Sequence, residues 1–436
     1  MNPTVALHTL GCKLNYSETT AMGRMLEQDG FIKKDFEEVA DVYVINTCSV
    51  TENADKECRQ LVRRIQRKAP EAMVVITGCY AQLKPTEIAA IPGVNLVLGA
   101  AEKFNIATHL KEIKKNDATR ICSCDIEDVN IFMASHSVDE RTRVFLKVQD
   151  GCNYNCSFCT IPMARGKSRS NRIENVLENV KTIAGGGAKE IVLTGINLGD
   201  YLSPSFTPSS SAGRENVAKM VAREGKENFF DLIKKLDAFD GIERYRISSI
   251  EPNLLSNDII AMVANSHHFM PHFHIPLQSG SNEILAAMRR RYRKELYAEK
   301  VRLIKTMMPH ACIGVDVIVG FPGETDLLFN ETVQFLQGLD ISYLHVFTYS
   351  ERDHTLALML GPVVPVNIRH NRNKILRNIS YTKMQEFTQQ HIGQTRKVLF
   401  ESRNKNGMME GYTDNYIKIT TPYKKEWENE IVEWVV

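Results

Sequence analysis

Three of the ten cysteines lie close together in the middle of the chain, as Cys152-Asn-Tyr-Asn-Cys156-Ser-Phe-Cys159. This C-x3-C-x2-C spacing places three thiolates within one short turn, where they can bind three irons of a [4Fe–4S] cluster. A zinc site would need a fourth ligand at a defined spacing, and none follows closely. The residues therefore predict an iron–sulfur cluster whose fourth iron stays open.

Three other cysteines, Cys12, Cys48 and Cys79, each end a short apolar run. The runs are rich in β-branched residues, and helical patterns separate them, which predicts parallel strands joined by right-handed crossovers. The cysteines should then meet at the C-terminal edge of one sheet, where open α/β folds bind ligands. Buried structural cysteines are the alternative. Their repeated position after Gly or Thr favours an iron–sulfur cluster, or a zinc ion, with one open position.

The composition is that of an ordinary globular chain, with 436 residues, 24% charged residues and a net charge of +2. It predicts two to four domains and no polybasic tail. No apolar run approaches the roughly 20 residues of a membrane helix, and the N-terminus lacks the pattern of a signal peptide. We therefore expect a cytoplasmic protein with no membrane partner, whose thiols stay reduced.

The elements that must position the central cysteines form a repeating pattern over residues 143–365. Six strand-like runs alternate with amphipathic helical stretches, and the cysteine loop directly follows the first run. Six β/α units cannot close an eight-stranded barrel, so the pattern predicts a three-quarter barrel with a lateral opening. The chemistry should lie at the C-terminal ends of its strands.

These cysteines and several further motifs resemble the radical S-adenosylmethionine (SAM) enzymes, and among them the methylthiotransferases. The resemblance covers nearly the whole chain. The matching motifs are GCKLN (11–15), NTCSVT (46–51), TGC (77–79), GCNYNCSFCTIPMARGKSRS (151–170), LTGINLGDY (193–201), SSIEP (248–252), HIPLQSGS (274–281) and GFPGET (320–325).

The resemblance implies replacement of an aromatic C–H of adenine by C–S–CH3. That hydrogen is barely acidic, so a radical route is expected, in which SAM bound to the cluster of Cys152, Cys156 and Cys159 is cleaved after one-electron reduction. The second [4Fe–4S] cluster, on Cys12, Cys48 and Cys79, would deliver the sulfur, and a second SAM would methylate it. The expected partners are a tRNA anticodon loop, an electron donor such as flavodoxin or ferredoxin, and a sulfur source.

Two details indicate which branch of the methylthiotransferases the sequence resembles. Lys13 follows Cys12, where the branch acting on isopentenyl-adenosine usually has Gln and the branch acting on a ribosomal protein aspartate usually has Pro. The stretch TENAD (51–55) is similar to the branch acting on N6-threonylcarbamoyladenosine of tRNA, at position 37 next to the anticodon. That substrate is expected, and the other two remain alternatives. A non-catalytic iron–sulfur protein for RNA binding or electron transfer, and a zinc-binding module, are the alternatives of other classes.

Polar residues at the barrel strand ends are candidate SAM contacts, although ordinary loop hydrogen bonds would explain them as well. Glu251 would suit a ribose hydroxyl or an ammonium group. Tyr154 and Phe158 would pack on adenine, shield the cluster or simply pack the loop. The full set is Tyr154, Phe158, Thr194, Gly195, Asn197, Ser248, Ser249, Glu251 and Gln278.

Basic and aromatic residues are candidate RNA contacts. Basic runs follow the cysteine loop and a later barrel strand, where they would meet phosphates, although solvated helix faces explain most such runs. From residue 371 a helix and short alternating strands follow. GYTDNYIKI (411–419) resembles the TRAM domain, a small RNA-binding β-barrel. The candidates are Arg165, Lys167, Arg169, Arg289, Arg290, Arg291, Tyr412 and Tyr416.

The expected organisation is an α/β fold with three domains and one linker: an N-terminal parallel-sheet domain (1–120), the linker (121–137), the partial barrel (138–370) and a TRAM-like domain (371–436). A Ser/Pro-rich stretch, 202–228, predicts a flexible insertion. His354 stands where the family has Gly. His267, His268, His272 and His274 crowd one segment without an adjoining acidic or thiol partner, so a structural or substrate-contact role is expected.

Overall fold

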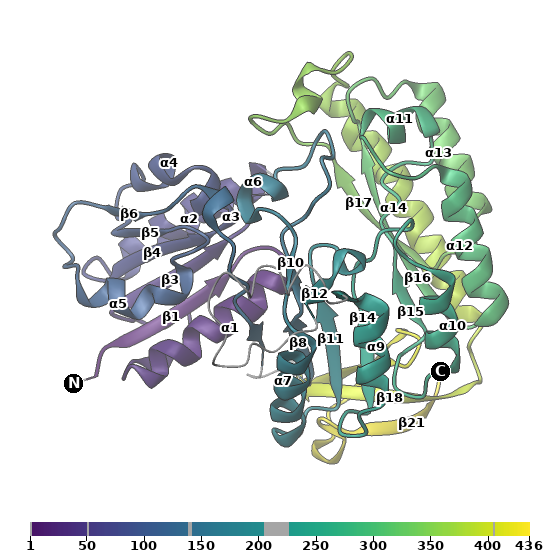
Figure 1. The fold of residues 1–436 in the computed structure, drawn as a ribbon, viewed down its shortest axis with the longest axis horizontal. Helices are drawn as coiled ribbons and strands as arrows, with labels where there is room; N and C mark the ends of the chain where they lie inside the picture. Colours follow the sequence, from purple (N-terminus) through teal and green to yellow (C-terminus); the bar gives the residue numbers. More distant parts are fainter. Residues whose placement is uncertain (1, 50–51, 138–141, 205–225, 404–405) are drawn as a thin grey trace, which may run out of the picture.

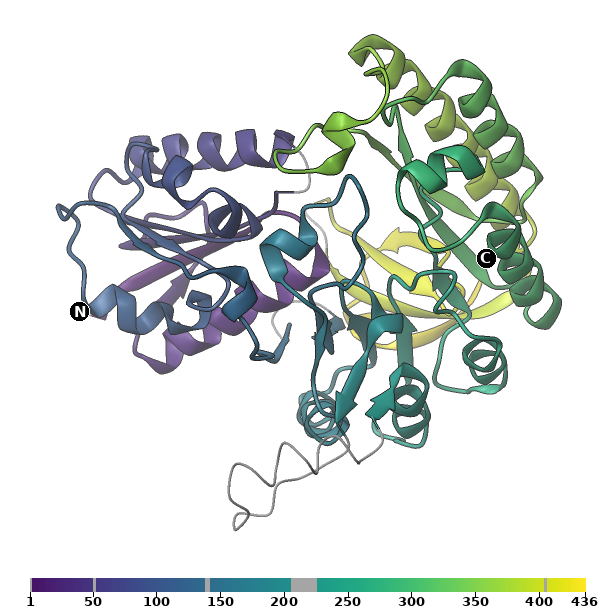
Figure 2. The same cartoon turned by 45° about the horizontal axis from the view of Figure 1, so that its top comes forward.

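We describe a computed structural model that covers residues 2–49, 52–137, 142–204, 226–403 and 406–436. Two α/β units lie side by side, and a third, smaller sheet packs beneath the second unit (Figure 1). Figure 2 shows the N-terminal unit beside the open side of the barrel. Across the described ranges, no helix is long and apolar enough to cross a membrane.

The N-terminal unit is a six-stranded, all-parallel sheet in the order β2-β1-β3-β4-β5-β6. Helices cover both faces, so every residue of the central strand β3 is buried, as its unbroken apolar run predicts. The strands are β1 (Thr4–Thr9), β2 (Ile32–Lys34), β3 (Val42–Thr47), β4 (Met73–Gly78), β5 (Leu96–Leu98) and β6 (Arg120–Cys122). The helices are α1 (Lys13–Gln28), α2 (Glu52–Lys68), α3 (Cys79–Leu83), α4 (Pro85–Ala89) and α5 (Ile106–Lys111).

The second unit contains the six predicted parallel strands. They are β8 (Arg143–Lys147), β11 (Glu190–Thr194), β14 (Arg244–Ile247), β15 (His272–His274), β16 (Cys312–Val319) and β17 (Tyr343–Thr348). Parallel bridges between Tyr245 and Phe269 and between Ser249 and His274 join the two halves of this arc. The main outer helices are α7 (Ile173–Gly185), α9 (Phe229–Asp237), α10 (Asn257–Asn265), α12 (Lys294–Met307), α13 (Asp326–Gly338) and α14 (Val366–Gln389). The remaining short elements are β7 (Ser135–His136), β9 (Gln149–Asp150), α6 (Ile161–Arg165), β10 (Arg169–Ser170) and α11 (Asn282–Ala287).

Alternating residues of the barrel strands face the outer helices and the barrel lumen. The residues that pack under the helices, such as Val144, Ile191 and Val317, are apolar and form the largest core of the protein. Their neighbours Arg143 and Glu190 are polar and lie on the opposite face. The face of these strands opposite the helices therefore carries buried and partly buried polar side chains.

The C-terminal strands form a four-stranded antiparallel sheet in the order β20-β19-β18-β21, which confirms the predicted change of architecture. They are β18 (Thr395–Arg403), β19 (Met408–Thr413), β20 (Lys418–Pro422) and β21 (Ile431–Val435). Phe400 stacks on Trp427 in its small core. The sheet is fixed to the barrel because Arg246 donates to the carbonyls of Thr413 and Asp414, at 2.8 Å each.

Three segments differ in detail from the sequence-based expectation. The helix expected from residue 371 is α14, which begins at Val366 and packs along β17, where the Ser380 hydroxyl bonds both backbone groups of Leu344. It therefore belongs to the barrel. Strand β6 places the start of the expected linker within the N-terminal sheet. The ends of the expected insertion pair as β12 (Leu202–Pro204) and β13 (Lys226–Asn228), whereas residues 205–225 lie outside the described ranges.

His354 keeps the left-handed backbone that the family glycine would adopt, with φ 64°. The loop is held in place because Arg352 forms an ion pair with Asp55 of the N-terminal unit at 2.8 Å. A side chain in this backbone region costs about 1–2 kcal/mol, and replacement of His354 by glycine would relieve that strain. Part of the relief is offset because glycine makes the unfolded chain more flexible. We expect His354→Gly to raise the free energy of unfolding by about 0.5 kcal/mol in urea titrations. As the control, His370→Gly inside α14 should lower the free energy of unfolding by about 1 kcal/mol. A lower free energy of unfolding in His354→Gly would contradict the backbone strain at His354.

Candidate active site

The three N-terminal cysteines lie at the ends of adjacent strands, as the sequence predicts. Cys12 precedes the first residue of α1, Cys48 follows β3, and Cys79 begins α3. Gly11 has φ 103°, and a Cβ there would lie 2.5 Å from Cβ and 3.0 Å from Sγ of Cys48. The glycine thus lets the loops of Cys12 and Cys48 approach closely. Three thiols at one sheet edge fit the donor set of an iron–sulfur cluster with one open iron.

Asn15 holds these cysteine loops together. Its amide nitrogen donates to the carbonyls of Leu10 and Thr47 at 2.9 and 3.0 Å, and thereby links the ends of β1 and β3. Cys48 and Cys79 are buried, whereas Cys12 is exposed. Burial raises the pKa of the Cys79 thiol, and the charge of Arg165 opposes that increase. The site is therefore closed on two sides and open at Cys12.

A buried ionic network joins the N-terminal unit to the barrel. Fully buried Glu18 of α1 contacts Lys103 at 2.8 Å, Lys147 at 2.9 Å and Arg165 at 3.1 Å. Asp150 contacts the same Arg165 at 3.0 Å. Burial alone would raise the pKa of Glu18, but Arg165, Lys103 and Lys147 hold it well below its usual value. Burial lowers the pKa of Arg165, but nearby negative charges, first that of Glu18 and then that of Cys79, raise it well above its usual value.

The central cysteines lie on the loop after β9. Backbone N–H groups of Tyr154 and Ile161 donate to the sulfurs of Cys152 and Cys159, at 3.4 Å each. Burial raises the pKa of Cys152 to about 11 and that of Cys159 to about 12. Hydrogen bonds to the sulfurs are typical of iron–sulfur ligands.

Arg290 completes this site from the loop after α11. Its guanidinium donates to Cys156 Sγ at 3.1 Å and forms an ion pair with Glu251. Burial raises the pKa of Glu251, and Arg290 counters the shift. Glu251 is therefore engaged by Arg290 and not directed at solvent.

The charge of Arg290 next to Cys156 should make a bound cluster easier to reduce. We expect Arg290→Met to shift the midpoint potential of that cluster to more negative values, on the order of 100 mV by Coulomb's law at an effective dielectric constant of about 20. An anaerobic redox titration followed by electron paramagnetic resonance measures it. Arg293→Met, which removes an exposed charge on the next turn, is the control. An unchanged potential in Arg290→Met would contradict the assignment.

The candidate SAM residues do not all lie together. Phe158 and Gln278 line a cavity of about 170 Å³ together with Cys159 and Asp316. All the others except Tyr154 lie at or just after the ends of β11 and β14. The hydroxyl of Thr194 is buried with no partner among the described residues, which leaves it available to a ligand. Ser248, Ser249 and Asn197 lie nearby on the same strand ends, and a Cβ at Gly195 would come within 2.8 Å of Gln149 Oε1.

Tyr154 lies elsewhere. It is 2% exposed, Asn253 donates to its hydroxyl at 2.7 Å, and Arg291 covers its ring at 4.0 Å. It therefore supports the cysteine loop.

The candidate RNA contacts also separate. Arg165 is 3% exposed within the ionic network and Arg290 is sequestered on Cys156, so the structure does not support phosphate contacts by either. Arg169 is drawn towards Asp150 at 3.4 Å. The exposed members are Lys167, Arg289 and Arg291. Tyr412 and Tyr416 stack on each other with ring centres 4.8 Å apart.

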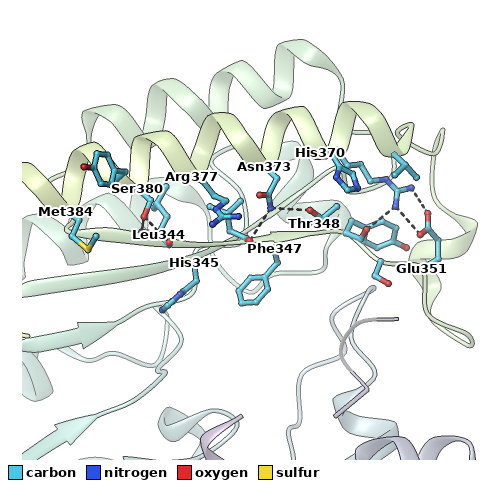
Figure 3. Close-up of a pocket in the computed structure, with 16 residues that line it drawn as sticks. Leu344, His345, Phe347, Thr348, Glu351, His370, Asn373, Arg377, Ser380 and Met384 are labelled. Atoms are coloured by element: carbon cyan, nitrogen blue, oxygen red, sulfur yellow. Dashed lines mark hydrogen bonds and ion pairs between the residues drawn. The ribbon is translucent and has the colours of Figure 1, made fainter. Parts of the chain in front are cut away.

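The cavity beside Cys12 shares a lining residue with a second hollow, which in turn shares residues with a third. Cys12 lines a cavity of about 360 Å³ that also includes Tyr416 of the C-terminal sheet. Tyr416 in turn lines a larger hollow, which reaches His345 and Met384. Figure 3 shows the groove that continues from these two residues between β17 and α14, with a volume of about 770 Å³. Arg369, Arg377 and Glu351 line it; buried Arg369 forms an ion pair with Glu351, whereas Arg377 is exposed.

Several residues of the site were not predicted from the sequence. Asp316 lies 2.8 Å from His274, so the histidine segment does have an acidic partner, contrary to the sequence-based expectation. The sequence did not reveal the pairing because Asp316 is on the neighbouring strand, 42 residues away.

Gln149 was also missed. Its Oε1 accepts hydrogen bonds from the backbone N–H groups of Ile196 and Asn197 at 2.8 and 3.0 Å and shapes the LTGIN loop. Its only sequence signal was its position just before the cysteine loop.

Comparison with known proteins agrees with this geometry. Residues 4–99 match a family described as "Uncharacterized protein family UPF0004", and residues 146–336 match the radical SAM superfamily. The radical SAM methyltransferase TsrM from Kitasatospora setae has a similar fold, with a TM-score of 0.53, 15% identity and coverage of 79% of this chain and 73% of TsrM. The barrel and its cysteine loop thus define a radical SAM enzyme, a class that uses a [4Fe–4S] cluster and SAM.

Curated relatives extend over almost the whole chain. "Threonylcarbamoyladenosine tRNA methylthiotransferase MtaB" from Bacillus subtilis is 37% identical, covering 99% of this chain and 93% of the relative. The protein of the same name from Aquifex aeolicus is 38% identical, covering 97% of each. A "tRNA-2-methylthio-N(6)-dimethylallyladenosine synthase" from Clostridium botulinum is 30% identical, covering 92% and 86%. The chain therefore belongs to the radical SAM methylthiotransferase family.

Proposed function

We propose that the protein inserts a methylthio group at C2 of N6-threonylcarbamoyladenosine at position 37 of tRNA, using two SAM molecules and two [4Fe–4S] clusters. Cys152, Cys156 and Cys159 would hold the cluster that binds SAM. Cys12, Cys48 and Cys79 would hold the second. When bound, the clusters and SAM would supply the radical chemistry, the methyl group and the sulfur, with electrons from an external donor. The protein's own residues position the adenine and exclude water.

One observation supports this proposal above the others: the cavities of the two cysteine sets lie on either side of contacts made by β15. Asp316 lines the cavity that contains Cys159 and contacts His274 of β15 at 2.8 Å. His272, two residues earlier on the same strand, lines the cavity that contains Cys12. A base bound between the cavities would therefore be close to both sites, as a reaction needs when one site activates carbon and the other delivers sulfur.

The open groove and the exposed cations near the cysteine loop support an RNA substrate. A nucleotide next to an anticodon lies in a loop, so it can leave the stack more cheaply than a paired base. The groove of β17 and α14 would accept the loop, with Lys167, Arg289 and Arg291 near the cysteine loop available to phosphates. The C-terminal sheet would act as the TRAM-like RNA-binding part. A flavodoxin or ferredoxin would supply electrons, a sulfur source would restore the second cluster, and a tRNA substrate implies a cytoplasmic location.

The substrate rests on the relatives named for threonylcarbamoyladenosine, which are more similar than those named for dimethylallyladenosine. Mass spectrometry of nucleosides from cells with and without the gene tests it. We expect the methylthio derivative of threonylcarbamoyladenosine to disappear on deletion and to return on complementation. Loss of methylthio-isopentenyladenosine instead would mean that isopentenyladenosine is the substrate, while the proposed reaction type would stand. No change in either nucleoside would overturn the tRNA assignment.

A further inference from the structure

The cavity beside Cys12 has an uneven charge. It has a volume of about 360 Å³, and residues of the N-terminal unit, the barrel and the C-terminal sheet line it. Three cationic side chains, Lys13, Arg143 and Arg246, belong to this lining, and no carboxylate does. A cavity with this lining favours an anionic group.

The two arginines already have partners. Arg246 contacts Glu190 at 2.8 Å and donates to two carbonyls of the C-terminal sheet. Arg143 forms an ion pair with Glu401 at 2.7 Å and lies over the ring of Tyr412 at 4.3 Å. These contacts fix both guanidinium groups as parts of the cavity wall.

Lys13 differs from the arginines. Among the described residues, its ammonium group has no hydrogen-bond or ion-pair partner. Lys13 is an exposed residue that lines the cavity beside two guanidinium groups, and no carboxylate shares the lining. An anionic group that entered the cavity would therefore be the ion-pair partner that this ammonium group lacks.

The rest of the lining suits a flat, polar ligand. His272 is 5% exposed and stacks on Tyr416 with ring centres 4.3 Å apart. Its Nε2 pairs with the hydroxyl of Tyr343 at 3.1 Å, whereas Nδ1 is buried with no partner in the described part of the chain. One polar atom thus remains available at the wall, next to aromatic surface.

We infer that this cavity receives the substituent on N6 of the substrate adenine and that the ammonium group of Lys13 binds its carboxylate. The inference rests on the proposed function. In adenine only N1 separates C2 from the carbon that carries N6, so a base whose C2 faces the cluster of Cys12 has its N6 substituent within a few bonds of the same wall. A threonylcarbamoyl group carries a carboxylate, whereas an isopentenyl group is uncharged and would leave Lys13 unpaired. Lys13 is thus assigned as a specificity-determining residue.

Equilibrium binding separates this role from turnover. The cluster-loaded protein, without reductant, is titrated with three anticodon stem-loops: one with threonylcarbamoyladenosine, one in which its carboxylate is a carboxamide, and one with plain adenosine. The wild-type protein should bind the acid about tenfold more tightly than the amide, as the loss of one charged hydrogen bond predicts. Lys13→Gln should bind the two equally, and Lys13→Arg should retain part of the preference. Lys114→Gln, at an exposed lysine after α5, should behave as the wild type.

The outcomes are distinguishable. An unchanged preference for the acid in Lys13→Gln would overturn the inference. Equal binding of acid and amide by the wild-type protein would overturn it too, with no variant needed and therefore no question of folding. In either case, methylthiolation of the acid stem-loop by the wild-type enzyme would leave the proposed function standing. Failure of the wild-type enzyme to modify that stem-loop, with modification of an isopentenyl stem-loop, would overturn the proposed function itself.

Discussion

Replacing Cys12, Cys48 or Cys79 with alanine is expected to abolish methylthiolation while the enzyme continues to cleave SAM. The three residues lie on the N-terminal sheet, whereas Cys152, Cys156 and Cys159 lie on the barrel loop. Each set can therefore lose its cluster without direct damage to the other. Changes in the surroundings of metal ligands commonly cost 10–100-fold, so loss of a ligand should lower product formation by at least about 100-fold.

The measurements are iron content, 5′-deoxyadenosine formation and methylthio product, each per protein chain. The N-terminal variants should lose about half of the iron and keep 5′-deoxyadenosine formation within a few-fold of the wild type. Cys156→Ala should lose both products. Cys58→Ala is the matched control, because Cys58 is buried on α2 and burial raises its thiol pKa to about 12, yet no cysteine set includes it.

Two results would contradict this division. Full methylthiolation by Cys12→Ala would show that the reaction does not require the second cluster. Loss of 5′-deoxyadenosine formation in all three N-terminal variants, with their secondary structure intact, would mean that the two sites do not work separately.

The sequence predicted those parts of the site that lie within short motifs. Cys152, Cys156 and Cys159 share one loop, so their spacing alone carried the chemistry. Cys12, Cys48 and Cys79 could be placed together because parallel strands with right-handed crossovers bring their C-terminal ends to one edge. The six barrel strands followed in the same way from alternating strand and helix patterns.

Contacts between distant segments were not predictable. Arg165 and Arg290 stood in basic runs, and such runs are usually solvated, so the sequence favoured RNA contacts for both. Their burial depends on Glu18, which is 147 residues from Arg165, and on the sulfur of Cys156, which is 134 residues from Arg290. Nothing local to either arginine distinguishes it from its exposed neighbours Lys167 and Arg291.

The network around Glu18 leads to the second large expected effect, which concerns stability. Glu18 is the carboxylate on which Lys103, Lys147 and Arg165 converge, and all four side chains are at most 7% exposed. Removal of one member of a buried ionic network leaves its partners uncompensated, which costs about 3–5 kcal/mol. We expect Glu18→Ala to lower the free energy of unfolding by that amount in urea titrations followed by circular dichroism. Glu37→Ala, which breaks an exposed pair with Arg64, should cost less than about 1 kcal/mol.

A double-mutant cycle identifies the cause. If the uncompensated cations destabilise Glu18→Ala, then Lys103→Met should be less harmful in that background than in the wild type, because it removes one of them. Additive effects of the two substitutions would instead point to lost packing at Glu18.

The same network predicts a dependence on pH. Because the folded protein holds the pKa of Glu18 well below its usual value near 4.5, the ionised carboxylate stabilises the fold above that pH. The contribution is lost as the pH falls through the lowered folded-state pKa, since protonation then removes the charge that Arg165, Lys103 and Lys147 require. Glu18→Gln lacks this titration. The free energy of unfolding of Glu18→Gln should therefore change less than that of the wild type between pH 5 and about pH 3. If the free energies of both proteins changed with pH in parallel, Glu18 would not carry the charge that joins the N-terminal unit to the barrel.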